Sequence, residues 1–148
     1  MPRGSLTLAR LHHVAHDDFL DLIRTSIGLV FANETEIKSL YKTQNFSGAV
    51  DAVRKDCAMA VITRSEKGSV IVNGADTIEV PAHPVKRVVD VTGAGDLYAA
   101  GFLFGYTRNA PLAQCARLGS LAAAEVISQV GARPASNLRE QARAQGLL

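Results

Sequence analysis

A run of small and acidic residues in the second half of the chain has the composition of a phosphate-binding loop. Residues 90–96 read Asp-Val-Thr-Gly-Ala-Gly-Asp and lie between a segment of strand type and a segment of helical type. Small side chains let the backbone approach a ligand closely, and the free N–H groups and dipole at the start of a helix bind anions. An aspartate at that place stays ionised and can orient or deprotonate a hydroxyl beside a bound phosphate. The loop therefore suits phosphoryl transfer, which needs little beyond positioning and charge neutralisation.

Two other phosphate-binding patterns do not fit this loop. A dinucleotide-binding fingerprint needs a glycine three positions after Gly95, where this chain has Tyr98. A P-loop needs a lysine directly after the loop, and none follows here. On these residues alone, a glycine-rich helix cap without a ligand stays open as an alternative, with Asp96 as an ordinary first-turn carboxylate.

The elements that would position this loop alternate between helical and strand patterns. Apolar residues recur with helical spacing at 17–27, 34–43, 47–55, 94–107 and 111–129, and a short helix is expected after residue 136. Strand patterns occur at 28–32, 60–63 and 87–91, and a hairpin is expected at 69–80 with its turn at 73–76. This order predicts an α/β layered domain. Residues 1–14 carry little pattern, and the composition of residues 2–5 fits a tag remnant and a natural start equally well.

Charge and cysteine content exclude several classes of protein. The chain has 148 residues, with 16 Lys and Arg against 14 Asp and Glu, and a net charge of +2. This balance is too small to favour nucleic acid or an anionic membrane as a partner, and the longest apolar run, 97–106, is about half of a membrane span. Cys57 and Cys115 form no disulfide framework, so we expect reduced thiols in a cytoplasmic protein.

Three segments together resemble the ribokinase/PfkB family of carbohydrate and nucleoside kinases. Residues 89–102, Val-Asp-Val-Thr-Gly-Ala-Gly-Asp-Leu-Tyr-Ala-Ala-Gly-Phe, are similar to the second signature of the family. Residues 33–36, Asn-Glu-Thr-Glu, resemble its Asn-x-x-Glu motif, and residues 62–68 resemble its nucleotide-binding strand and turn. The likeness covers about residues 17–136 and is strongest to adenosine-kinase-like members. It implies a layered α/β/α ribokinase-like fold that transfers the γ-phosphate of ATP to a hydroxyl of a nucleoside, adenosine foremost, or of a sugar.

The resemblance also implies roles for individual residues. Asp96 matches the catalytic base, and Glu36 matches the residue that positions Mg²⁺, while the anion hole for the γ-phosphate corresponds to Gly93, Ala94 and Gly95. Contacts to the nucleotide and its phosphates correspond to Asn33, Thr63, Ser65, Gly68 and, least directly, Ser120. A monovalent cation site, for K⁺, corresponds to Asp90, Thr92, Val126, Gln129 and Gly131. Arg64, in the nucleotide turn, either touches phosphate or lies on a solvated turn.

Complete members of the family carry a further N-terminal half with the acceptor pocket and a lid. We therefore divide the chain into an irregular or tag-derived segment, 1–16, and a nucleotide-binding C-terminal half, 17–148, of a truncated fold. Without a lid to exclude water we expect at most weak kinase activity, and an exposed sheet edge favours self-association. Two alternatives stay open: a non-catalytic ATP-binding module, such as half of a split kinase, and a non-functional gene fragment.

Overall fold

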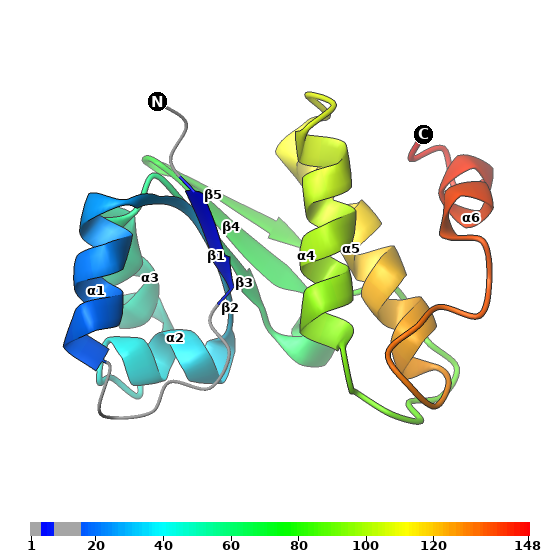
Figure 1. The fold of residues 1–148 in the computed structure, drawn as a ribbon, viewed down its shortest axis with the longest axis horizontal. Helices are drawn as coiled ribbons and strands as arrows, with labels where there is room; N and C mark the ends of the chain where they lie inside the picture. Colours follow the sequence, from blue (N-terminus) through cyan, green and yellow to red (C-terminus); the bar gives the residue numbers. More distant parts are fainter. Residues whose placement is uncertain (1–3, 8–15) are drawn as a thin grey trace. The chain divides into compact units, whose positions relative to one another are not determined.

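The computed structural model describes residues 4–7 and 16–148, which form two compact units (Figure 1). The first unit contains the described residues up to Arg64 together with Ser69–Ile78, and the second contains Ser65–Gly68 together with Glu79–Leu148. The elements alternate as the sequence pattern predicts, and the fold belongs to the α/β class.

A five-stranded sheet runs in the order β1-β2-β3-β4-β5. Its strands are β1 (Gly4–Thr7), β2 (Ile27–Asn33), β3 (Met59–Thr63), β4 (Ser69–Asn73) and β5 (Asp76–Val80). The first three are parallel, whereas β4 runs antiparallel to β3. The register places Asn33 beside Thr63, and Thr63 beside Ser69. The carboxyl ends of β2 and β3 therefore lie together, which is where open α/β sheets bind ligands.

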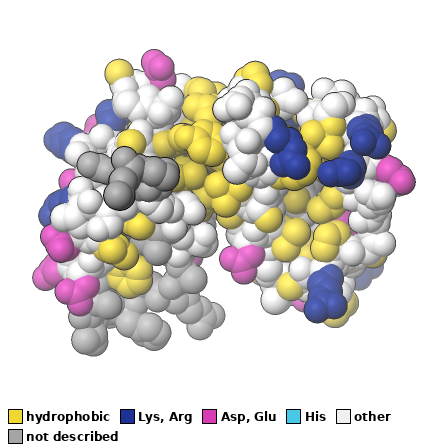
Figure 2. Space-filling view, turned by 45° about the horizontal axis from the view of Figure 1, so that its top comes forward, with side chains coloured by type: hydrophobic (Ala, Val, Ile, Leu, Met, Phe, Trp, Pro, Cys, Tyr) yellow, Lys and Arg dark blue, Asp and Glu magenta, His cyan; other side chains and the backbone are white. Residues whose placement is uncertain are grey.

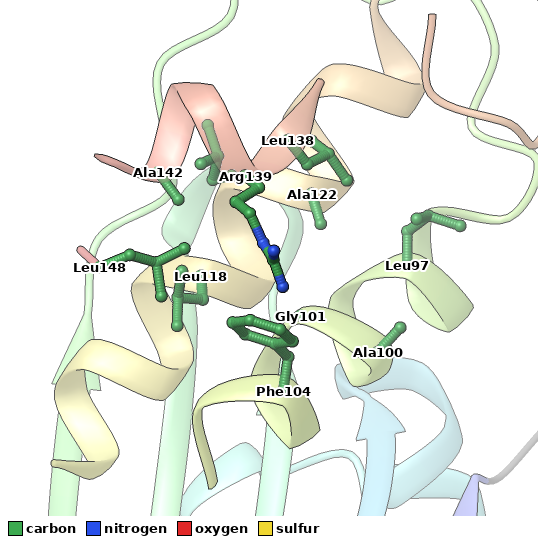
Figure 3. Close-up of a pocket in the computed structure, with 11 residues that line it drawn as sticks. Leu97, Ala100, Gly101, Phe104, Leu118, Ala122, Leu138, Arg139, Ala142 and Leu148 are labelled. Atoms are coloured by element: carbon green, nitrogen blue, oxygen red, sulfur yellow. The ribbon is translucent and has the colours of Figure 1, made fainter. Parts of the chain in front are cut away.

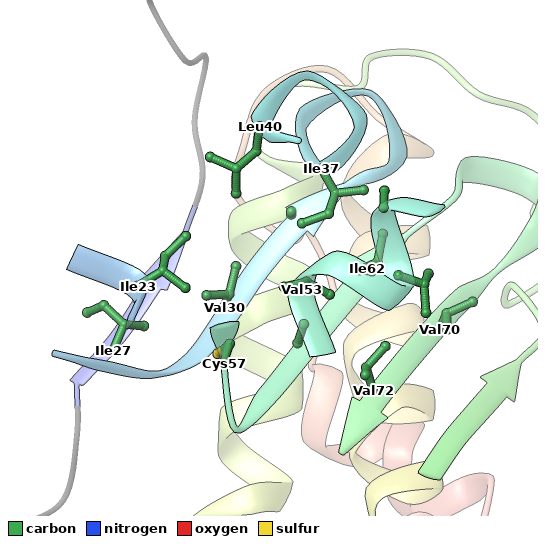
Figure 4. Packing of buried hydrophobic residues seen from close by; sticks show 14 residues of the cluster. Ile23, Ile27, Val30, Ile37, Leu40, Val53, Cys57, Ile62, Val70 and Val72 are labelled. Atoms are coloured by element: carbon green, nitrogen blue, oxygen red, sulfur yellow. The ribbon is translucent and has the colours of Figure 1, made fainter. Parts of the chain in front are cut away.

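Three helices pack on the sheet of the first unit: α1 (His16–Thr25), α2 (Glu34–Leu40) and α3 (Phe46–Asp56). Their apolar faces meet the sheet in one cluster, in which Ile23, Val30 and Ile62 are fully buried (Figure 4). The Asp56 carboxylate links the helices, accepting hydrogen bonds from Arg24 Nε at 3.0 Å and the Tyr41 hydroxyl at 3.1 Å. Burial, together with the Asp56 charge, raises the pKa of Tyr41 far above its ordinary value, so this hydroxyl remains a donor.

The second unit is built on α4 (Ala94–Tyr106), α5 (Leu112–Ile127) and α6 (Leu138–Ala144). Glycines let the first two helices approach closely, because a Cβ on Gly101 would lie 2.6 Å from the Leu118 carbonyl oxygen. On the other helix, a Cβ on Gly119 would lie 2.7 Å from the Tyr98 carbonyl oxygen. These contacts fix the position of α4, whose first turn carries the glycine-rich loop.

The structure differs from the sequence expectations at several places. The strand expected at 87–91 is wrong: this segment is irregular, and the amides of Val89 and Asp90 donate to the Ile127 carbonyl at 2.7 and 3.4 Å instead of to a neighbouring strand. Ile27 opens β2 rather than ending a helix, and α2 ends at Leu40. Strand β1 includes two residues that composition grouped with a tag remnant, whereas residues 1–3 and 8–15 lie outside the described residues.

The surface carries no sign of a large charged interface on the face that Figure 2 shows. There the lysine and arginine side chains of the described residues are dispersed among polar and apolar ones. Within the ranges that the structure describes, the helices are all too short or too polar to cross a membrane.

Candidate functional site

The glycine-rich loop forms the start of α4, as predicted. Gly93 is the N-cap residue and has φ 79° and ψ 2°, in the left-handed region. The amide of Ala94 donates to the Val91 carbonyl at 3.2 Å, and that of Leu97 donates to the Gly93 carbonyl at 2.9 Å. Between them, the amides of Gly95 and Asp96 have no acceptor among the described residues. This helix start therefore presents two backbone donors, which suits an anion.

The two glycines of the loop are required for different reasons. A Cβ on Gly93 would lie 2.7 Å from the Cβ of Ala132, and its positive φ disfavours any side chain. Gly95 has neither constraint, since a Cβ there would meet no heavy atom of the described chain within 4 Å. Nothing in the described fold demands glycine at 95, so the open space beside its backbone fits the close approach of a ligand.

We expect Gly93→Ala to lower the free energy of unfolding by about 1–3 kcal/mol, because it adds backbone strain and a clash. Gly146→Ala is the matched control: Gly146 has a similar φ of +67° but open space around its Cβ. The control should cost about 1 kcal/mol, from strain alone. Chemical denaturation measures both, and equal costs would show that the segment around Ala132 does not pack against the loop.

Asp90 holds the loop against the segment that follows α5. Its carboxylate accepts hydrogen bonds from the Thr92 hydroxyl at 2.6 Å, the Thr92 amide at 2.9 Å and the Gly131 amide at 3.1 Å. These bonds, that of the Thr92 hydroxyl first, hold the pKa of Asp90 below its ordinary value, so it stays ionised. The structure thus brings together three of the five residues of the expected cation site.

The other two residues of that expected set are placed differently. The Gln129 side-chain amide donates to the Arg133 carbonyl, within the same loop. Val126 is fully buried, and because its side chain has no donor atom it could ligate a cation only through its backbone carbonyl. An ionised carboxylate with backbone carbonyls is a donor set that suits a hard cation.

In the first unit, Asn33 and Glu36 form a reciprocal cap at the start of α2. The Asn33 side-chain oxygen accepts from the Glu36 amide at 2.8 Å, and a Glu36 carboxylate oxygen accepts from the Asn33 amide at 2.8 Å. This capping box stabilises the helix start and uses the same residue types as the expected magnesium motif. The described residues contain no group of three or more His, Cys, Asp or Glu that could form a metal cage. A lone carboxylate still fits Mg²⁺ carried on substrate phosphates, because that ion keeps several waters.

The expected nucleotide turn is shaped by its own backbone. Ser65 has φ 52°, a left-handed conformation that glycine adopts more easily. Gly68, at φ 87°, packs against the end of β5, because a Cβ there would lie 2.1 Å from the Val80 carbonyl oxygen. The Ser120 hydroxyl accepts a hydrogen bond from the His83 amide at 2.8 Å. Gly68 and Ser120 thus have structural partners within the second unit.

Sequence reasoning missed the partner of Arg64. Its guanidinium Nε donates to the Glu34 carboxylate at 2.8 Å and its Cζ lies 3.8 Å from the centroid of the Phe46 ring. Glu34 also forms an ion pair with Lys38, whose Nζ lies 3.4 Å from Glu34 Oε1. The spacing of four residues predicts this second pair from the sequence, whereas no sequence pattern predicts the pair with Arg64.

A separate apolar cavity of about 260 Å³ lies among the three helices of the second unit (Figure 3). Leu97, Phe104 and Leu118 line it, and Arg139 extends into it from α6. None of the expected site residues lines this cavity. It offers shape and apolar contact, but no group for proton transfer or phosphate binding apart from that arginine.

Comparison with sequence families agrees with the resemblance carried by these residues. The pfkB family carbohydrate kinase profile matches residues 6–138. The cytidine kinase of Thermococcus kodakarensis is 37% identical over 122 residues, which cover 80% of this chain and 44% of that protein. The chain thus spans less than half the length of this relative.

Solved structures give the same picture. The adenosine kinase from Sinorhizobium meliloti superimposes with a TM-score of 0.94 at 45% identity, covering 97% of this chain and 45% of that one. The Methanocaldococcus jannaschii nucleoside kinase, an archaeal member of the ribokinase family, has a TM-score of 0.69 at 31% identity. The superposition covers 79% of this chain and 38% of the nucleoside kinase chain. The fold is therefore ribokinase-like.

Proposed function

We propose a function from the premise that this chain belongs to the pfkB family of carbohydrate kinases. The chain binds ATP and supplies the catalytic base for transfer of the γ-phosphate to a hydroxyl of a nucleoside or sugar. The observation that carries the proposal is the start of α4, where two donor amides and the open space at Gly95 occur in the same helical turn as Asp96. Because similar proteins are named kinases of the small molecules cytidine and adenosine, we place this chain in the cytoplasm with small-molecule partners.

In this mechanism each residue of the loop has one task. The Asp96 carboxylate takes the proton from the acceptor hydroxyl as the hydroxyl oxygen attacks the γ-phosphorus of ATP, and the bond from that phosphorus to the β–γ bridging oxygen breaks to release ADP. The amides of Gly95 and Asp96, within the hole formed with Gly93 and Ala94, stabilise the negative charge that develops on the transferred phosphoryl group. The Asp90 carboxylate keeps the loop in this conformation by accepting hydrogen bonds from the Thr92 and Gly131 amides.

The remaining expected residues bind the nucleotide and its cations. Asn33, Thr63 and Ser65 contact ATP, and Gly68 and Ser120 shape the surrounding backbone. Glu36 would hold water molecules of Mg²⁺, which supplies charge neutralisation on the phosphates. A monovalent cation, K⁺, would be held beside the loop by the residues Asp90, Thr92, Val126, Gln129 and Gly131.

Adenosine is the acceptor that we test first. The 45%-identical solved relative is named an adenosine kinase, and the 37%-identical curated relative is named a cytidine kinase. A 44%-identical solved relative from Rhizobium etli is named a probable sugar kinase, so sugars are the second class of acceptor to test.

Mg-ATP should raise the melting temperature of the chain by several degrees. A ligand at about 100 times its Kd adds about 2.7 kcal/mol to the free energy of unfolding. Differential scanning fluorimetry with and without saturating Mg-ATP measures this shift. A cooperative melt without a shift contradicts the proposal, and the lack of any cooperative melt favours a non-functional fragment.

Gly95→Ala should abolish that shift without destabilising the fold. The added Cβ lies within 4 Å of no described protein atom, so the free energy of unfolding should rise by about 0.5 kcal/mol, because alanine lowers the backbone entropy of the unfolded state. The same methyl group would occupy the space that we assign to the ligand. The matched control is Gly48→Ala in the first turn of α3, where a Cβ meets only ordinary contacts of 3.7 Å or more. The control should keep the full shift. A Gly95→Ala protein that retains it would show that no phosphate binds at this helix start.

A further inference from the structure

We infer that the ion pair of Arg64 with Glu34 is a positioning device for the start of α2, and that Arg64 is not a phosphate ligand. The inference rests on the proposed function, in which Asn33 and Glu36 at this helix start serve the nucleotide phosphates and their magnesium ion. It assigns a role to a cationic residue of the nucleotide turn that the proposed reaction does not use directly.

One guanidinium joins three elements of the first unit. Arg64 directly follows the last residue of β3, Glu34 is the first residue of α2, and Phe46 is the first residue of α3. The Arg64 Nε donates to the Glu34 carboxylate at 2.8 Å, and the Arg64 Cζ lies 3.8 Å from the centroid of the Phe46 ring. Phe46 itself packs against the buried cluster of the unit. The Glu34 carboxylate therefore contacts the edge of the guanidinium, and the Phe46 ring contacts its face.

These contacts are more than a surface ion pair. The side chains of Arg64 and Glu34 are only 21% and 25% exposed, so both are largely withdrawn from water. Screening is weaker there than on an open surface, and a planar guanidinium that is stacked and hydrogen-bonded has little freedom left. Only Nε is engaged by the carboxylate, so Nη1 and Nη2 keep their donors, but the ion pair and the ring together fix the directions in which these donors point.

The position of Glu34 connects this pair to the expected site. It lies between Asn33, the N-cap residue, and Glu36, the third residue of the helix, whose reciprocal bonds are both 2.8 Å long. Asn33 is in register with Thr63, the residue before Arg64. The backbone register and the ion pair thus tie the first turn of α2 to the end of β3 at two adjacent points.

Charge gives the pair a second effect. The hydrogen bond from Arg64 is the main reason why the pKa of Glu34 lies below its ordinary value, with a smaller effect from Lys38. Glu34 is therefore ionised, and Arg64 neutralises it beside the helix start that the proposed function assigns to polyphosphate. Without the arginine, that negative charge would oppose ATP through like-charge repulsion.

A double-mutant cycle separates positioning from direct phosphate contact. The variants are Arg64→Met, Glu34→Gln and the two combined, with Lys38→Met as the control that removes only the weaker 3.4 Å partner of Glu34. Two quantities are measured on each: amide hydrogen exchange at Asn33 and Glu36 without nucleotide, and the Kd for Mg-ATP by calorimetry.

We expect both single variants to speed exchange at these two amides, because either change breaks the same tie. Arg64→Met should weaken Mg-ATP binding by about fivefold, and Glu34→Gln should weaken it by less, because that variant also removes the negative charge. The double variant should bind no more weakly than Arg64→Met, and Lys38→Met should change the Kd by less than about twofold. A direct phosphate contact predicts the reverse for Glu34→Gln, which would release Arg64 and leave binding unchanged or tighter. If Arg64→Met does not give a cooperative melt, Arg64→Gln, which also removes the charge, replaces it in the cycle.

The outcomes distinguish this inference from the proposed function. Normal Mg-ATP binding by the unaltered chain, with Glu34→Gln leaving both Kd and exchange unchanged, overturns the inference and leaves the function standing. Failure of the unaltered chain to bind Mg-ATP overturns the function and the inference together. Faster exchange with an unchanged Kd also overturns the inference, because the pair would then stabilise the helix without serving the nucleotide.

Discussion

Replacing Asp96 with asparagine is expected to slow phosphoryl transfer by about 10²- to 10⁴-fold while leaving nucleotide binding intact. Asparagine has nearly the same shape, but its side-chain amide does not accept the proton of the acceptor hydroxyl. The backbone amide at 96 is unchanged, so the anion hole keeps its donors. The melting shift with Mg-ATP should therefore persist within about one degree.

The comparison is best made in a single turnover with γ-labelled ATP and adenosine, where slow transfer is still detected. Asp51→Asn is the control, because Asp51 is an exposed residue of α3 and undergoes the same chemical change. Its transfer rate should equal that of the unaltered chain. Equal rates for Asp96→Asn would remove this residue as the base, and a lost melting shift would make it a binding residue instead.

Much of the fold follows from local patterns. The alternation of short apolar strands with helical spacing gives the correct order of β2, β3, the β4–β5 hairpin and the last three helices. The glycine-rich loop is also predicted correctly, because α4 begins at Ala94 and Gly93 adopts the left-handed conformation that only glycine takes readily. Such features depend on residues close together in the chain.

The features that the sequence did not predict depend on residues that are far apart in the chain. The valines at 88, 89 and 91 have strand propensity, but Val91 is 68% exposed and the nearby amides bond to the end of α5. Propensity describes how well a residue fits a sheet, and it does not supply the neighbouring strand. The tie from Asp90 to Gly131 spans 41 positions and that from Arg64 to Glu34 spans 30. Only the register of the strands and loops brings such pairs together.

The Asn-x-x-Glu segment shows a different limit of sequence reasoning. One spacing serves two physical purposes, since Asn33 and Glu36 cap a helix through reciprocal bonds and also have the donor atoms for phosphate and magnesium. Residue types therefore identify the segment but do not tell a helix cap from a nucleotide site. The Kd for Mg-ATP and the amide exchange of Arg64→Met and Glu34→Gln distinguish the two, because only a nucleotide site links the helix start to the Kd.

Gly119→Val is expected to have the largest effect on stability, lowering the free energy of unfolding by about 3 kcal/mol or more. A Cβ at this position lies 2.7 Å from the Tyr98 carbonyl oxygen and 3.1 Å from two atoms of its ring, and the two further methyl groups of valine add to the conflict. The obstacle is helix backbone, which moves only if α4 and α5 separate. Separation would expose apolar surface of both helices, including the buried Ala116 and Phe102.

A thermal melt measures the result as a fall of about 10 °C or more, since each kcal/mol is worth about 3 °C at this chain length. Arg117→Val is the matched control, because it places the same side chain on an exposed position of α5. It should cost less than about 1 kcal/mol, from helix propensity alone. Because α4 carries Asp96 and the anion loop, we also expect Gly119→Val to lose the Mg-ATP shift even where the protein remains folded. A tolerated valine would mean that the helices are not in backbone contact, and the loop would then need another support.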